Sequence, residues 1–206
     1  MQIIDENNQK AAKIAAQFIL EGKIIAFPTD TVYGIACDAA NSNAVAQLYK
    51  IKKRDLKKPI AIFVKDIATA KKIFIFDELA EETLKTFAKK PLTLVLKTRD
   101  YNDSDDKIKL ANNLNNDENN NLKNKFLGFR IVNRKFITNL LEEFGGTLAV
   151  SSANPSGQES AISADDVKKY FPKLDLLVDG GFSQQKTAST VIKIANQKIE
   201  ILRQDL

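Results

Sequence analysis

The sequence contains no histidine and only one cysteine. Without histidine the chain cannot build a Ser-His-Asp triad, a Cys-His dyad or an HExxH zinc site. The single cysteine, Cys37, excludes four-cysteine zinc sites, CxxC redox chemistry and intramolecular disulfides, and we expect it to be buried and inert. Any chemistry must therefore use carboxylate, amine, guanidinium, hydroxyl, amide and backbone N–H groups. That set suits electrostatic stabilisation of phosphates better than proton shuttling at neutral pH.

Long apolar segments are also missing. No run approaches the ~18 residues that a membrane-spanning helix needs. Residues 1–13 are polar and lack the basic and then apolar pattern of a secretion signal. At 206 residues the chain has the size of one ordinary domain, which needs no disulfide or metal for stability. The sequence therefore predicts a soluble, cytoplasmic protein that does not enter membranes, with one domain spanning residues 1–206.

Arginine is scarce in an otherwise basic chain. The formal net charge is +5, which permits a polyanionic partner such as a nucleotide or RNA without requiring one. Of the 31 basic residues only five are arginines. A guanidinium binds phosphate or carboxylate through two parallel hydrogen bonds, which lysine cannot do, so each arginine is a candidate ligand. The five are Arg54, Arg99, Arg130, Arg134 and Arg203.

Predicted helices and strands alternate along the chain, which is typical of an α/β fold with a largely buried sheet. Apolar residues at helical spacing predict helices over 9–21, 42–53, 66–89 with a break near residue 76, 135–144 and 163–170. Short apolar runs predict strands over 24–27, 60–64, 92–96, 126–129, 147–150 and 174–178, and a final hairpin of 189–194 with 198–202. Residues 99–125 are rich in asparagine and bury too little apolar area to offset the entropy of ordering. We expect them to form a long loop or disordered insertion within the domain.

Three polar clusters are candidates for ligand binding. Residues 50–59 carry six cations, which could form a clamp for polyphosphate or only the solvated end of a helix. Residues 151–157, with sequence SSANPSG, follow a predicted strand, where ligands of open α/β sheets bind. Residues 28–34 follow another strand, and there we expect Asp30 to be a turn cap rather than a base. Alone, each cluster could equally be an ordinary turn, and neither a P-loop nor a Rossmann fingerprint is present.

Together, and in this order, the clusters resemble one family, the YrdC-like threonylcarbamoyl-AMP synthases. The PTDT-[VL]-YG segment matches residues 28–34 without change, and the KxR…SxN signature matches Lys52, Arg54, Ser152 and Asn154. Further matches are the PLT strand at 91–93, the arginine of the VR strand at Arg130, the DGG turn at 179–181, the STV element at 189–191 and the ILR ending at 201–203. The resemblance covers residues 8–203 apart from the asparagine-rich segment. It is closest to short members without a second C-terminal domain.

The resemblance implies both a fold and a reaction. The fold would be a twisted mixed α/β sheet with flanking helices and a concave basic cavity. The reaction would condense L-threonine, bicarbonate and ATP, the last with Mg²⁺, into threonylcarbamoyl-AMP and pyrophosphate. The product would feed the downstream tRNA threonylcarbamoyl transferase machinery. A carbamate oxygen attacks the α-phosphorus in this reaction, so no step requires an imidazole.

The resemblance also assigns site residues. Lys52 and Arg54 are the candidates for catalysis. The expected ATP contacts are Arg54, Lys58, Arg130, Ser152, Asn154, Ser160 and Arg203. The expected threonine contacts are Thr31, Arg134, Val150 and Ser189, with Thr93 at the cavity floor. No residue is assigned to hold a metal.

The chain departs from the family pattern at several positions. The departures are Lys53 for the usual glycine, Asp55 for proline, Phe63 for histidine, Val132 for proline, Arg134 for histidine or another polar residue, Ser151 for proline and Gln204 for proline. Two other functions stay open on the sequence. One is an RNA-binding module without catalysis, which the charge would suit. The other is a carbamoyl-transfer domain like those within larger hydrogenase-maturation proteins.

Overall fold

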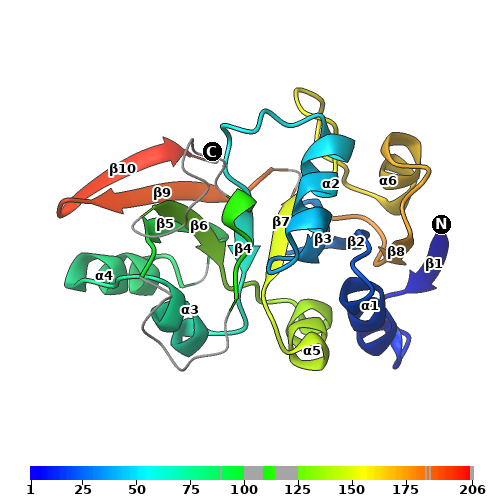
Figure 1. Ribbon diagram of the computed structural model, residues 1–206, viewed down its shortest axis with the longest axis horizontal. Helices are drawn as coiled ribbons and strands as arrows, with labels where there is room; N and C mark the ends of the chain where they lie inside the picture. Colours follow the sequence, from blue (N-terminus) through cyan, green and yellow to red (C-terminus); the bar gives the residue numbers. More distant parts are fainter. Residues whose placement is uncertain (89, 100–108, 115–124, 184, 186, 205–206) are drawn as a thin grey trace.

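A ten-stranded mixed sheet forms the centre of the protein (Figure 1). The computed structural model describes residues 1–88, 90–99, 109–114, 125–183, 185 and 187–204. The strand order is β1-β8-β2-β3-β7-β4-β6-β5-β9-β10. The strands are β1 (Gln2–Asp5), β2 (Ile25–Pro28), β3 (Tyr33–Asp38), β4 (Ala61–Phe63), β5 (Leu92–Lys97), β6 (Phe126–Arg130), β7 (Leu148–Ser152), β8 (Leu176–Asp179), β9 (Thr190–Ala195) and β10 (Lys198–Arg203).

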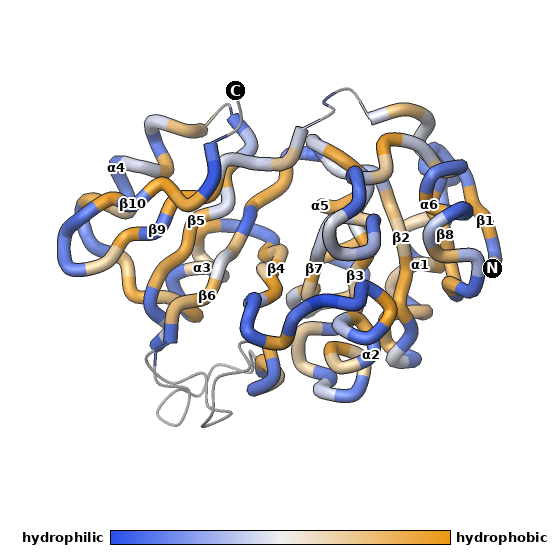
Figure 2. Tube along the Cα trace, turned by 90° about the horizontal axis from the view of Figure 1, so that it is seen from above, coloured by the Kyte–Doolittle hydropathy of each residue, from blue (hydrophilic) through white to orange (hydrophobic). Residues whose placement is uncertain are grey.

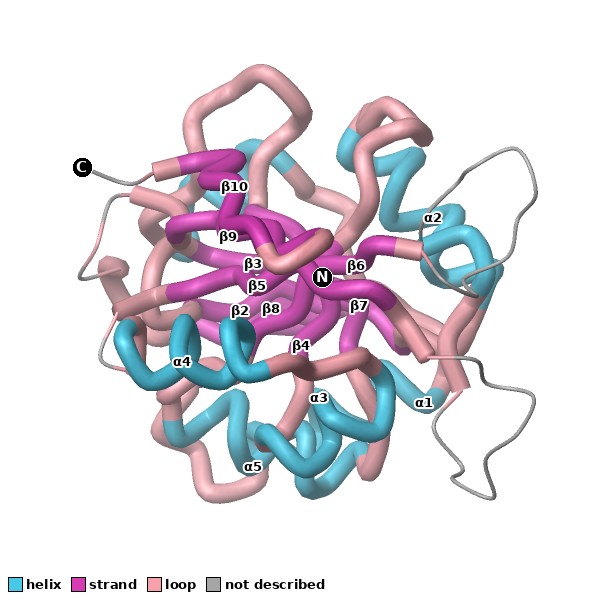
Figure 3. Tube along the Cα trace, turned by 90° about the vertical axis from the view of Figure 1, so that its left-hand side faces the viewer, coloured by secondary structure: helices cyan, strands magenta, loops and turns pink. Residues whose placement is uncertain are grey.

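Helices pack on both faces of this sheet (Figure 3). They are α1 (Ala11–Leu20), α2 (Ser42–Lys52), α3 (Ile67–Ile73), α4 (Glu78–Thr86), α5 (Lys135–Phe144) and α6 (Ala164–Tyr170), with a 3₁₀ turn, η2 (Asn112–Leu114). One apolar core joins the sheet to α2, α3, α4 and α6. A second core joins the opposite face to α1 and α5. In Figure 1, α3 and α4 lie far from α2 and α6, although all four pack against the same core. The twist between neighbouring strands accumulates across a wide sheet, so one face points in different directions at its two ends.

The hydrophobic residues concentrate in the strands (Figure 2). Helices α1 and α5 cover the face that β8, β2, β3 and β7 present, through Phe27, Leu148 and Val178 among others. The same face continues onto β4, β6, β5 and β9, where alternate residues such as Ala61, Gly128 and Thr93 line a cavity instead. Half of one sheet face is therefore used for packing, and the other half forms the floor of a hollow.

The predicted elements are confirmed with small shifts at their ends. The helix expected over 66–89 is divided into α3 and α4, and Asp66 and Asp77 cap their N-termini through the Thr69 and Ala80 N–H groups. The capping box of Ser163 with Asp166 is present at α6. The final hairpin turns at Asn196 and Gln197, both with positive φ, which suits a tight two-residue turn.

Two strands were not predicted from the sequence. β1 contains a single buried residue, Ile4, and pairs in parallel with β8. β3 lies immediately after the polar 28–32 segment and pairs with both β2 and β7. Cys37 lies in β3, fully buried as expected, and burial raises the pKa of its thiol.

Most of the asparagine-rich segment, residues 100–108 and 115–124, lies outside the described residues. Residues 109–114 are described. Within them Ala111 and Leu114 are buried, and the Leu114 carbonyl accepts hydrogen bonds from Ile60 N–H and the Tyr49 hydroxyl. Residues 109–114 therefore contribute to the core that joins the sheet to α2, α3, α4 and α6.

Candidate active site

A cavity of about 310 Å³ opens over the part of the sheet that helices α1 and α5 leave uncovered. Its floor consists of small and apolar side chains from neighbouring strands, together with Arg130 from the end of β6. The floor is closely packed at Gly128, where a Cβ atom would approach the Thr93 methyl group to 3.1 Å. The rim adds hydroxyl groups and two more guanidinium groups, from Arg54 and Arg203. The lining residues include no Asp or Glu, so the cavity suits anions.

Residues 29–34 form one wall of the cavity in a tightly bonded turn. The Thr29 hydroxyl donates to the Val32 carbonyl at 2.7 Å and accepts from Thr31 N–H at 3.0 Å. Asp30 is not a turn cap, contrary to the expectation from sequence. Its carboxylate pairs with the Arg130 guanidinium, with 2.6 Å between Oδ1 and Nη2. The wall is thereby tied to the floor by an ion pair across 100 residues of sequence.

Arg130 is the most buried arginine of the site, with 7% of its surface exposed. Its Nη1 donates to the Thr31 hydroxyl at 3.4 Å, and its guanidinium carbon lies 5.4 Å from the centre of the Phe63 ring. The buried Nε has no hydrogen-bond partner among the described residues. A buried donor without a partner is costly, so the fold keeps a desolvated guanidinium beneath the cavity at some expense of stability.

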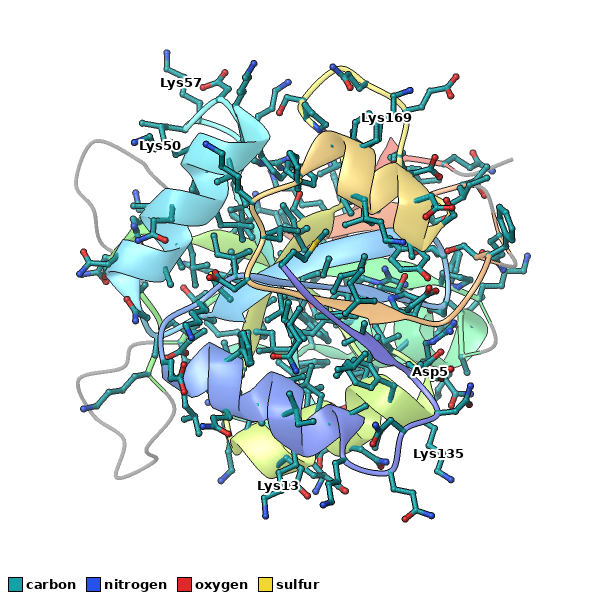
Figure 4. The ribbon with its side chains drawn as sticks, turned by 90° about the vertical axis from the view of Figure 1, so that its right-hand side faces the viewer. Asp5, Lys13, Lys50, Lys57, Lys135 and Lys169 are labelled. Atoms are coloured by element: carbon teal, nitrogen blue, oxygen red, sulfur yellow. The ribbon has the colours of Figure 1, made fainter. Side chains whose placement is uncertain are left out.

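Lys52 is the one lysine of the 50–59 cluster that is buried, at 2% exposure. Its Nζ donates to the Ser152 carbonyl at 2.5 Å and to the Asn154 carbonyl at 2.7 Å, while its own carbonyl accepts from Ser156 N–H. Burial lowers the pKa of Lys52 to about 7, with a smaller contribution from the charge of Arg54. Lys52 and Asn154 lie behind the lining rather than in it. Lys50 and Lys57 point outward, as Figure 4 shows.

Ser152 does line the cavity, and its hydroxyl donates to the Asn154 side-chain oxygen at 2.6 Å. The Asn154 amide nitrogen donates in turn to the Gln158 carbonyl at 2.6 Å. The Ser152 and Asn154 side chains of the SxN motif are therefore bonded to each other, and Lys52 of the KxR motif donates to the backbone carbonyls of both residues. These contacts explain why the two motifs occur together.

Arg54 lies at the cavity rim, where its Nε and Nη2 donate to the carbonyls of Lys58 and Pro59 at 3.0 and 2.8 Å. Lys58 itself is exposed, and it lies outside the lining, as does the half-buried Ser160. The structure therefore brings Arg54, Arg130, Ser152 and Arg203 together and leaves Lys58 and Ser160 apart from them.

Ser189, Thr93 and Arg203 form a connected group at the opposite rim. The two hydroxyl groups are 2.7 Å apart, and Arg203 donates through Nε and Nη2 to the Ser189 carbonyl at 2.9 and 2.7 Å. Thr31 and Val150 also line the cavity. Of the expected threonine-side residues, Thr31, Val150 and Ser189 are therefore adjacent to one space.

Arg134, the fourth expected threonine contact, lies outside the lining. It forms a two-pronged ion pair with Glu6, in which Nε to Oε1 is 2.6 Å and Nη2 to Oε2 is 2.5 Å. Sequence reasoning missed Glu6, because nothing in residues 1–13 marks it as a partner of a residue 128 positions away.

Tyr33 was quoted in a motif but had no assigned role. Its buried hydroxyl donates to the Gly181 carbonyl at 2.7 Å and accepts from Gly180 N–H at 3.1 Å. Burial raises the pKa of this phenol to about 12, so it is neutral and can donate this bond at physiological pH. The PTDT-VYG and DGG motifs are thus in direct contact.

Comparisons with known proteins show which family the chain belongs to. The Sua5/YciO/YrdC family, described as "Telomere recombination", matches residues 17–205. A putative threonylcarbamoyl-AMP synthase of Methanocaldococcus jannaschii is 31% identical over 204 residues, covering 98% of this chain and 89% of that protein. The chain belongs to the Sua5/YciO/YrdC family. A threonylcarbamoyl-AMP synthase of Pseudoalteromonas atlantica is 30% identical over 84% of this chain and 86% of its own length.

Solved structures of the Sua5/YciO/YrdC family share the fold. Pyrococcus abyssi Sua5 complexed with L-threonine has a TM-score of 0.83 and 29% identity, and the match covers 98% of this chain and 56% of Sua5. The bovine threonylcarbamoyl-AMP synthase is likewise matched over 57% of its length, at 32% identity. The chain therefore spans about half the length of some family members and most of others. HypF, at 22% identity and a TM-score of 0.79, shows the fold alone.

Two of the departures from the family pattern have visible consequences. Phe63, in place of histidine, presents its ring to the Arg130 guanidinium, so it contributes a cation–π contact where the usual residue offers a polar nitrogen. Lys53, in place of glycine, ends α2 with φ of 51°, a left-handed conformation that favours glycine. The family's glycine at this position thus has a conformational reason.

The described residues contain no cluster of three His, Cys, Asp or Glu side chains that could hold a metal ion. The donor set of the cavity does not fit a resident metal, because its lining offers hydroxyl and guanidinium groups and no carboxylate. No helix formed by the described residues has the length and apolar character needed to cross a bilayer.

A second cavity, of about 710 Å³, lies between α3, α4 and α5 and is lined mainly by apolar residues such as Leu84, Phe87 and Phe129. Although it is larger, it shares only Arg130 with the first cavity and lacks Arg54, Arg203 and the hydroxyl groups of Thr31, Ser152 and Ser189. We therefore place the candidate active site in the smaller cavity.

Proposed function

We propose that this protein is a threonylcarbamoyl-AMP synthase, which joins L-threonine, bicarbonate and ATP into threonylcarbamoyl-AMP with release of pyrophosphate and water. Family membership, with relatives of that name at 30–32% identity over most of the chain, supports the reaction class. The threonine-bound Sua5 structure supports an amino acid as one substrate.

The observation that carries the proposal is the state of Arg130. Its guanidinium is buried beneath a cavity without carboxylates in its lining, and its Nε–H has no partner among the described residues. Asp30 and Phe63 hold the guanidinium in place before any ligand binds. A preorganised, desolvated cation stabilises negative charge that develops during phosphoryl or adenylyl transfer.

The proposed reaction has two steps, formation of a carbamate and transfer of the adenylyl group to it. The threonine amine adds to bicarbonate with loss of water, which gives an N-carboxylate. One oxygen of this carbamate attacks the α-phosphorus of ATP, the bond from that phosphorus to the bridging oxygen breaks, and pyrophosphate leaves with the electron pair. Arg54, Arg130 and Arg203 surround one space and can hold the phosphates. Mg²⁺ enters as part of the MgATP substrate, because the lining offers it no carboxylate.

Threonine would lie near the hydroxyl groups of Thr31 and Ser189. Lys58, Ser160 and Arg134 remain predicted contacts, which the structure places outside the cavity lining. The product would pass to the tRNA threonylcarbamoyl transferase machinery. Direct binding of RNA is a separate prediction, for which strong dependence on salt and indifference to threonine would be the signature.

A pyrophosphate-release assay tests the proposal. Threonine, bicarbonate and ATP are omitted in turn, and serine replaces threonine in a further reaction. We expect release only when all three substrates are present, and the product should contain threonine, carbonyl carbon and AMP in equal amounts by mass spectrometry. Pyrophosphate release that ignores threonine, or a carbamoyl-adenylate formed without any amino acid, would contradict the proposal and favour a carbamoyl-transfer activity.

A further inference from the structure

The N-terminal segment contributes a charge to the edge of the active site. Glu6 follows β1, and its backbone N–H donates to the Asp179 carbonyl at 2.8 Å. Its side chain is 15% exposed and is engaged on both oxygens by Arg134. In Figure 4, Asp5 and Lys135, the sequence neighbours of this pair, lie on the same side of the molecule. Glu6 precedes the part of the chain that the family match covers, residues 17–205.

Arg134 connects Glu6 to the cavity wall. While Nε and Nη2 are occupied by Glu6, Nη1 donates to the Thr29 carbonyl at 3.0 Å. Thr29 is the first residue of the turn that lines the cavity, and Arg130 holds the next two residues of that turn. The turn is therefore fixed by two arginines, and each of them has its own carboxylate partner, Asp30 for Arg130 and Glu6 for Arg134.

The pocket that holds the pair is closely fitted. A Cβ atom on Gly180 would lie 2.2 Å from Glu6 Oε2 and 2.8 Å from Arg134 Nη2. The DGG turn thus lacks a side chain at its middle residue where the ion pair packs against it. The same turn is held from the other side by the Tyr33 hydroxyl. An ion pair that is two-pronged and closely packed can fix the positions of its residues, whereas an isolated exposed ion pair contributes little.

We propose that Glu6 is a positioning residue for the threonine subsite, acting through Arg134 on the Thr29 carbonyl. This inference rests on the proposed function, since it assigns the 29–31 turn to threonine binding. If Glu6 is neutralised, Arg134 loses its counter-ion and the geometry that directs Nη1 at Thr29. The turn is then held on one side only, and threonine binds to a less ordered wall.

A different arrangement makes the opposite prediction. If Arg134 leaves Glu6 to bind the threonine carboxylate directly, Glu6 competes with the substrate, and its neutralisation strengthens threonine binding. The sign of the change in KM for threonine therefore decides between positioning and competition.

The test compares Glu6→Gln with Glu21→Gln, a matched change that removes an exposed ion pair with Lys23. Steady-state pyrophosphate release gives kcat and the KM for threonine and ATP separately. For Glu6→Gln we expect the KM for threonine to rise about five- to thirtyfold, with kcat and the KM for ATP within about twofold of wild type. Glu21→Gln should match wild type throughout. In a double-mutant cycle, Glu6→Gln should add little to Arg134→Gln, because Glu6 acts through Arg134.

An unchanged or lowered KM for threonine in Glu6→Gln would overturn the inference. So would a fall in kcat and a rise of both KM values in proportion to a lowered melting temperature, since that pattern reports only a loss of folding. The wild-type protein is assayed in parallel with each substrate omitted. This control separates failure of the proposed function from failure of the role assigned to Glu6. If wild type shows no threonine-dependent release, the proposed function fails. If wild type is active and Glu6→Gln equals it, only the role of Glu6 fails.

Discussion

Lys52→Met is the substitution for which the structure gives the sharpest expectation, because it removes a buried cation and leaves an unbranched apolar side chain that is only one atom shorter. Two carbonyl groups, of Ser152 and Asn154, lose their donor. An unsatisfied buried acceptor costs about 1–3 kcal/mol. Opposing this, burial lowers the pKa of Lys52 from 10.5 to about 7, so the folded protein bears a cost of about 5 kcal/mol to keep the ammonium charged.

These two effects have opposite signs and similar size. We therefore expect the free energy of unfolding at pH 7 to change by less than about 2 kcal/mol, a shift of at most about 8 °C in Tm. Activity should respond differently, because the 152–158 turn is anchored on Lys52 through both its side chain and its carbonyl. We expect kcat/KM for ATP to fall more than about tenfold, which corresponds to about 1.4 kcal/mol in the transition state.

Pyrophosphate release against ATP concentration, together with thermal unfolding, measures both quantities. Lys57→Met is the matched control, since Lys57 belongs to the same cluster but is exposed. Activity equal to wild type in Lys52→Met would refute the positioning of the turn by this lysine. A fall in Tm far beyond about 8 °C would refute the balance of the two effects.

Other predictions follow from single features of the structure. Lys53→Gly should raise stability by about 1 kcal/mol without loss of activity, because φ at this helix end is 51°; a lower Tm would contradict this. Since burial lowers the pKa of Lys52, the unfolded chain binds more protons than the folded chain between pH 7 and 10.5, so the free energy of unfolding should rise with pH there, and urea titrations of Lys52→Met should lack that slope. Arg54→Ala should lower turnover more than about tenfold, through loss of a charge-assisted contact of about 1.5–3 kcal/mol; unchanged threonine-dependent release would remove Arg54 from the site. Cys37 should react with thiol reagents only after unfolding, since it is fully buried and burial raises the pKa of its thiol; rapid labelling of the native protein would contradict the fold around β3.

The fold was predictable wherever a local pattern determines it. Helix α5 has strong apolar periodicity and ends at Gly145 in a left-handed conformation, so both its bounds could be read from the sequence. β3 could not, because it is composed largely of small residues, and its polar approach suggests a loop. β1 exposes three of its four residues, and only its pairing with β8 identifies it as a strand. These two strands depend on tertiary contacts that a single sequence does not record.

The sequence predicted the types of residue in the candidate site better than it predicted their hydrogen-bond and ion-pair partners. Of the five arginines that the sequence marks as candidate ligands, Arg54, Arg130 and Arg203 line the cavity, whereas Arg134 lies outside the lining and Arg99 donates to the Phe74 carbonyl. The sequence did not reveal that Lys52 faces backbone carbonyls or that Arg134 faces a carboxylate near the N-terminus. Such partners are separated by 100 and 128 residues, and local spacing carries no information about them.

The use of arginine at and beside the cavity of so lysine-rich a chain is explained by what four guanidinium groups do without substrate. Arg54, Arg134 and Arg203 each donate to a backbone carbonyl of a residue that lines the cavity, and Arg130 is held by Asp30. A lysine ammonium at these positions could make the protein contact or the ligand contact, but its single nitrogen lacks the planar fork that allows both in fixed directions. Because the guanidinium groups are already ordered, the side-chain entropy cost of binding is reduced. The guanidinium groups of Arg54, Arg130 and Arg203, which line the cavity, thus shape it and face a bound anion in fixed directions, which a lysine-lined cavity of equal charge could not do.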